Sequence, residues 1–174
     1  MTRTDPPLRA DEAATLRGYL DFHRDTLRLK TDGLSREQLG ATHAPSPMTL
    51  GGMVKHLALV EDHWFGVILH GEEQAELWRD IDWDGDPDWE WRTGSTDDPA
   101  ELRALFDDAC ATADSRIERA LANGGLDHES VGESRRGEGH FSLRWIIVHM
   151  IEEYARHNGH ADLIRESIDG ETGE

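Results

Sequence analysis

Hydrophobic side chains recur every three or four residues along four segments of the chain, which is the spacing of one face of an α-helix. These segments predict helices at about residues 9–31, 49–70, 99–122 and 142–168. Strand-like alternation of apolar and polar residues is almost absent. At 1.5 Å per residue each helix would be roughly 30–40 Å long, so the pattern predicts an all-α protein built as a four-helix bundle.

Residues that begin and end helices stand at the borders of these segments. Thr49 is placed to cap the second helix, while Asp98 and Pro99 form a cap and first helical position for the third. Gly51 and Gly52 are poor helix formers in the first turn of the second helix. Their lack of a side chain predicts that another backbone comes close at this point.

Three connections separate the predicted helices. Residues 34–47 contain a short turn at 35–38, and residues 126–140 form a polar, glycine-containing connection. The segment 72–97 is a long acidic loop between the second and third helices. It is either a surface loop that its tryptophans attach to the bundle, or a lid or wall over a site. Its tryptophans are Trp78, Trp83, Trp89 and Trp91.

Length and charge restrict the class of protein. The 174 residues favour one domain over residues 1–174, and no apolar stretch approaches the roughly 18 residues that a membrane span needs. With 18 basic and 36 acidic residues, the net charge is -18, which disfavours binding to nucleic acid or to anionic membranes. We therefore expect a soluble, cytoplasmic protein. The lone cysteine, Cys110, excludes an intrachain disulfide, and its surroundings predict a small core residue.

The ten histidines give the first indication of chemistry. On the predicted fourth helix, His149, Glu153, His157 and His160 share a face with apolar residues, and polar groups buried without partners are costly. Residues four apart lie about 6 Å apart along the axis, so adjacent members of this series can reach one ion. His149 and His157 cannot do so together, because their axial separation is about 12 Å.

The second helix contributes His56 and His63, of which only one can join a single metal site, since they are about 10 Å apart along the axis. His56 faces inward and is the better candidate. Two imidazoles and one carboxylate form the ligand set of catalytic zinc sites with an open position, and also of non-haem Fe(II) sites. The alternative is that these histidines are satisfied core residues.

Two segments resemble the DinB/YfiT-like superfamily: residues 49–64, TLGGMVKHLALVEDHW, and residues 143–162, LRWIIVHMIEEYARHNGHAD. Within it, they are most similar to the branch related to the N-terminal metal-binding domain of mycothiol-dependent maleylpyruvate isomerase. The resemblance implies an up-down-down-up four-helix bundle that holds one divalent metal. Matched residue by residue, it implies the ligands His56, Glu153 and His157. Zinc is the favoured ion, with nickel, iron or manganese as alternatives.

That isomerase has a further C-terminal domain without a counterpart in these residues, so we do not expect its reaction. Other members of the superfamily resemble thiol S-transferases that use bacillithiol or mycothiol, and the preference for arginine over lysine favours mycothiol. The resemblance thus implies a metal-dependent S-transferase that joins a small-molecule thiol to an electrophile. The alternatives are a metal-dependent hydrolase and a non-enzymatic bundle that binds a metal or a partner.

Other residues receive less specific roles. His63 and His160 are candidate catalytic residues that could relay a proton or orient a ligand. Trp64 and His149 are candidate cofactor-binding residues, and Trp64 would form the wall of the pocket together with the loop 72–97. Relatives of this kind are commonly dimers, so a homodimer is a further expectation.

Overall fold

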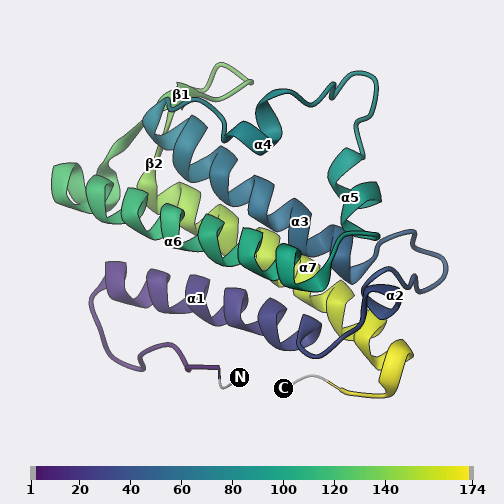
Figure 1. Cartoon of the computed structure of the whole chain (residues 1–174). Helices are drawn as coiled ribbons and strands as arrows, with labels where there is room; N and C mark the ends of the chain where they lie inside the picture. Colours follow the sequence, from purple (N-terminus) through teal and green to yellow (C-terminus); the bar gives the residue numbers. More distant parts are fainter. Residues whose placement is uncertain (1–2, 173–174) are drawn as a thin grey trace.

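Four long helical segments make up most of the computed structural model, which describes residues 3–172 (Figure 1). The described chain is 65% helix and 6% strand, so the predicted all-α class is confirmed at this level. The long segments and the shorter elements between them follow in chain order. The helices are α1 (Glu12–Thr31), α2 (Arg36–Leu39), α3 (Leu50–Glu61) with its continuation η1 (Asp62–Ile68), α4 (Glu76–Arg79), α5 (Trp89–Gly94), α6 (Pro99–Gly124), η2 (Gly125–Asp127) and α7 (Leu143–Asp169).

Polar side chains cap the long helices where the sequence predicted their ends. The Thr49 side chain accepts a hydrogen bond from the backbone N–H of Gly52, and Asp98 accepts one from Ala100. Each cap satisfies a backbone donor that has no partner within its own helix. The predicted starts of the second and third helices are therefore confirmed. The predicted turn at residues 35–38 is also present, as the short helix α2.

The long helices bury one continuous apolar core. Helix α1 packs along α7, and α3 packs along α6, while α3 also contacts α7 (Figure 1). The residues facing inward are fully enclosed, with Leu27, Leu57, Ile117 and Ile146 among those at 0% exposure. This packing holds α3 and α7 next to each other, which places the predicted histidines of both helices on neighbouring faces. No helix of residues 3–172 is long and apolar enough to cross a membrane.

The segment 72–97 was expected to be one long loop, which is wrong for part of its length, because it contains the short helices α4 and α5. Its second short helix, α5, packs against the first turn of α3, where the chain has two glycines. A Cβ atom on Gly51 would lie 2.2 Å from the carbonyl oxygen of Gly94, which is closer than any real contact. The predicted close approach of another backbone to Gly51 and Gly52 is therefore confirmed, and α5 is the element that makes it.

Two local features differ from the sequence prediction. The connection at residues 126–140 showed no strand-like alternation, yet β1 (Glu129–Glu133) and β2 (His140–Ser142) form an antiparallel hairpin with a bulged register there. The strands are too short for alternation to be visible in the sequence. The second helix also widens into a π-helix over η1, where the buried Asp62 bonds to Arg116.

Candidate metal centre

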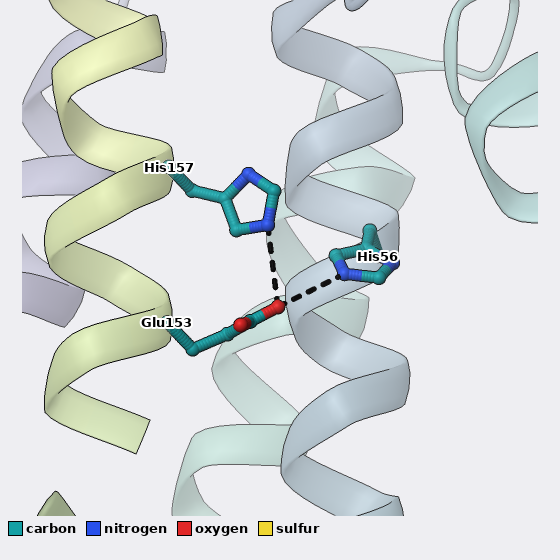
Figure 2. A group of neighbouring side chains, drawn as sticks. All are labelled: His56, Glu153 and His157. Atoms are coloured by element: carbon teal, nitrogen blue, oxygen red, sulfur yellow. Dashed lines mark hydrogen bonds and ion pairs between the residues drawn. The ribbon is translucent and has the colours of Figure 1, made fainter. Parts of the chain in front are cut away.

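Three side chains from α3 and α7 point toward one another in the interior between the two helices (Figure 2). Glu153 Oε1 lies 3.4 Å from His56 Nε2 and 3.3 Å from His157 Nε2. All three ligand atoms lie within 4.8 Å of one another. Glu153 and His157 are one helical turn apart on α7, and His56 reaches them from α3. The structure thus brings together the three residues that the resemblance implied.

These separations fit a metal ion. Bonds of about 2.1 Å at tetrahedral angles put neighbouring ligand atoms about 3.4 Å apart. The two distances to Glu153 Oε1 match that spacing, and the set of two imidazoles and one carboxylate leaves a coordination position for another ligand. The side chains of His56 and Glu153 are 20% and 21% exposed, so a small molecule can approach them.

A fourth residue, Glu90, holds the ring of His56 from behind. Its Oε1 lies 3.0 Å from His56 Nδ1, and Glu90 is only 5% exposed. A neutral imidazole that donates through Nδ1 has its lone pair on Nε2, the atom that faces Glu153. The carboxylate therefore selects the tautomer that can bind a cation. Glu90 lies on α5, so the docking of this short helix against Gly51 positions it.

The electrostatics of the cluster favour positive charge between these groups. Hydrogen bonds to His157 and His56 hold the pKa of Glu153 well below its usual range, although burial opposes them. Burial lowers the pKa of His56, but hydrogen bonds to Glu153 and Glu90 outweigh it and leave that pKa raised. Glu153 is thus ionised at neutral pH. A carboxylate with imidazole nitrogens on two sides attracts either protons or a metal cation.

Trp91, the residue after Glu90, covers one side of the cluster. Its ring stacks on His56 with a centroid distance of 4.7 Å and an interplanar angle of 27°, and lies 5.6 Å from the ring of His157. Trp78 is buried in the core, which fits the expectation that tryptophans attach this segment to the bundle, whereas Trp91 lies beside the cluster. An aromatic wall limits the access of water and strengthens electrostatic interactions within the site.

The other predicted site residues lie outside the cluster. His160 follows on α7 with its ring 6.2 Å from that of His157, and its Nδ1 is buried without a partner among the described residues. His149 lies one turn before Glu153, and its ring contacts Trp64 at 4.5 Å. His63 packs edge-on against Trp64, at 5.8 Å. Trp64, which was expected to line the wall of the pocket, packs instead against His63 and His149, away from the cluster. Its role and the roles of the three histidines stay predictions.

Sequence reasoning missed a buried ionic network next to the cluster. Arg24 of α1 forms two hydrogen bonds of 2.7 Å with Glu61 of α3, and the hydroxyl of Tyr154 donates a third of 2.7 Å to Glu61. Glu61 and Tyr154 are completely buried. Because Tyr154 directly follows Glu153, this network fixes the alignment of α3 with α7. Isolated charged positions within apolar helix faces were the only signal for it.

Cys110 is a core residue, as its surroundings predicted. The thiol is 3% exposed, and burial, together with the charge of Glu61, raises its pKa to about 12. At neutral pH it is therefore protonated and unreactive.

Comparison with known proteins adds one finding. The family model described as Mycothiol-S-transferase matches residues 15–170 of this chain. The match covers both helices that carry the cluster, and also the segment that contains Glu90 and Trp91. Among curated proteins, none matches the chain.

Proposed function

Because the chain belongs to the mycothiol S-transferase family, we propose that it joins the sulfur of mycothiol to an electrophilic small molecule at the cluster of His56, Glu153 and His157. The observation that carries this proposal is the convergence of three metal-binding side chains, from two helices, on one point that a small molecule can reach. The family match indicates that the thiol is mycothiol, and the arrangement of the three side chains suggests how its sulfur would be activated.

The charge of the cluster suits this reaction. His56, Glu153 and His157 would hold a divalent cation, for which we propose zinc, and such a cation would lower the pKa of a thiol that reaches it. Two neutral imidazoles and the single negative charge of Glu153 leave such a centre with a net positive charge, which favours an anionic thiolate. The S–H proton passes to water, a bond forms between sulfur and the electrophilic carbon, and the leaving group departs with its bonding electron pair.

The surrounding residues hold this arrangement in place. We propose that Glu90 keeps Nε2 of His56 available, since a carboxylate that accepts from the other ring nitrogen commonly orients a metal-binding histidine. Trp91 restricts the access of water to the reacting sulfur. His160 and His63 stay candidate catalytic residues, and Trp64 and His149 stay candidate cofactor-binding residues.

We also propose the finer description of the fold. The four long helices would form one DinB-like bundle, up-down-down-up, that is a single domain over residues 1–174. The pairing of α1 with α7 and of α3 with α6 supports this arrangement. A homodimer and a cytoplasmic location stay predictions that accompany it.

The function is tested with protein purified without a histidine tag and loaded with zinc, then mixed with mycothiol and monochlorobimane. We expect fluorescent conjugate to form faster with metal-loaded than with metal-free protein. His56→Ala and His157→Ala should abolish this rate and lower the zinc content, whereas His140→Ala, on the exposed hairpin, should change neither. Zinc binding without a thiol-dependent reaction would instead favour a binding protein, and turnover independent of thiol would favour a hydrolase.

A further inference from the structure

An open pocket of about 610 Å³ adjoins the cluster on the side of Trp91. It lies between the connection from α2 to α3 and the short helix α5, and its volume suits a small-molecule ligand. Its lining combines one aromatic ring, that of Trp91, with hydroxyl groups, one carboxylate, one guanidinium and an imidazole of the cluster. The residues that carry these polar groups are Thr42, Thr49, Ser95, Asp88, Arg92 and His157.

The pocket leads to the cluster itself. His157 is both a member of the cluster and part of the pocket lining, and Trp91 lies beside His157 while it stacks on His56. A molecule in the pocket can therefore extend one end to the cluster while the rest stays between α5 and the connection. This geometry suits a thiol whose sulfur is at one end of a larger polar group.

The charges in the pocket are asymmetric. Asp88 lines the pocket, is exposed, and its carboxylate has no hydrogen bond or ion pair within residues 3–172. The one cation of the lining, Arg92, is paired with Asp86 outside it. The pocket thus offers an uncompensated hydrogen-bond acceptor. A carboxylate accepts hydrogen bonds from neighbouring hydroxyl groups and repels other carboxylates.

We propose that this pocket binds the sugar part of mycothiol, and that Asp88 selects this neutral thiol against thiols that contain carboxylates. The inference rests on the proposed function. In mycothiol the cysteine is linked to a glucosaminyl-inositol, which has many hydroxyl groups and no carboxylate. Glutathione, in contrast, contains two carboxylates. Hydroxyls of the sugar would donate to Asp88, and the hydroxyl groups of Thr42 and Ser95 line the same pocket.

The selection is tested by comparing kcat/KM for mycothiol with kcat/KM for glutathione. Asp88→Asn keeps the shape of the side chain and removes its charge, so we expect the ratio of the two values to fall roughly 3- to 10-fold. Asp84→Asn, at an exposed position of the same segment and outside the pocket lining, makes the same change in net charge and should leave the ratio unchanged. An unchanged ratio in Asp88→Asn, or an equal fall in both variants, would overturn the proposal.

A binding measurement separates the pocket from the reaction. N-acetylglucosaminyl-inositol, which has no sulfur, is titrated into metal-free protein and followed by NMR. We expect the backbone signals of Thr42, Asp88 and Ser95 to shift, and Thr42→Val with Asp88→Asn to weaken binding at least about 5-fold. If no thiol supports conjugation yet the sugar binds here, the proposed function fails and the pocket stands. If conjugation occurs but these signals do not move, the pocket proposal fails alone.

Discussion

Replacing Glu90 with alanine removes the carboxylate that accepts a hydrogen bond from Nδ1 of His56, and we expect zinc affinity to fall. Outer partners of metal-binding histidines typically contribute about 10- to 100-fold in affinity, or about 1.4–2.7 kcal/mol. The 3.0 Å separation and the 5% exposure of Glu90 place it toward the upper part of this range. The stacking of Trp91 on His56 stays in the variant and limits the loss, because it still restrains the ring.

A second substitution divides the effect between charge and orientation. Glu90→Gln retains an oxygen that can accept from His56 but has no charge, and charge-assisted hydrogen bonds are about twice as strong as neutral ones. We therefore expect an affinity loss of about 3- to 10-fold, which is roughly half the alanine effect on a logarithmic scale. Glu76→Ala, an exposed residue of the same segment, is the matched control and should bind zinc like the unaltered protein.

Affinity is measured by competition with a chromophoric chelator, and geometry by the visible absorption of the Co²⁺-substituted protein. The Co²⁺ spectrum should change in Glu90→Ala and stay close to the original in Glu90→Gln, since the glutamine keeps the ring in place. Thermal unfolding of the metal-free variants identifies any general loss of stability. Equal zinc affinity and an unchanged Co²⁺ spectrum in Glu90→Ala would refute the role given to this residue.

Three further predictions concern the scaffold. Glu61→Leu removes the buried carboxylate that pairs with Nε and Nη2 of Arg24, which then keeps only Asp21 and Asp114 at Nη1. This change should lower the free energy of unfolding, measured in urea, by about 3–5 kcal/mol. Gly51→Ala should push α5 away from α3, lower the free energy of unfolding by about 1–3 kcal/mol and weaken zinc binding. Gly159→Ala, whose added Cβ would meet no neighbouring segment within 4 Å, should instead raise the free energy of unfolding by about 0.5–1 kcal/mol. Cys110 should react with Ellman's reagent only in denatured protein. Because the folded state raises the pKa of this thiol, its contribution to the free energy of unfolding should decline as the pH rises from about 9 to about 12. Cys110→Ala should remove this decline.

The parts of the structure that could be predicted are those encoded within single helices. The four-residue spacing of Glu153 and His157 fixes their relative position wherever the helix packs. Thr49 and Asp98 mark the starts of two helices because their side chains accept a hydrogen bond from a backbone N–H of the first turn. The choice of His56 over His63 needed only the direction of a helix face. These inferences depend on local geometry, which the order of residues determines.

The parts that could not be predicted depend on contacts between distant segments. Glu90 is one acid among many in its segment, and only the docking of α5 distinguishes it from its neighbours. Gly51 and Gly52 indicated that some backbone would come close, but not which one. The pairing of Arg24 with Glu61 likewise joins two helices whose facing sides have no local signature.

The acidity of the protein does not by itself explain a preference between thiols. At physiological ionic strength the Debye length is about 8 Å, so most of the net charge of -18 is screened from a molecule in the pocket. Only the charged groups that line the pocket lie close enough to act strongly on a bound molecule. Of these, Arg92 forms an ion pair with Asp86, whereas the carboxylate of Asp88 has no such partner among residues 3–172. The same segment that supplies Asp88 also supplies Glu90 and Trp91. A few residues of α5 and the turn before it can thus set both the orientation of His56 and the choice of thiol, while the long helices supply the three side chains of the cluster.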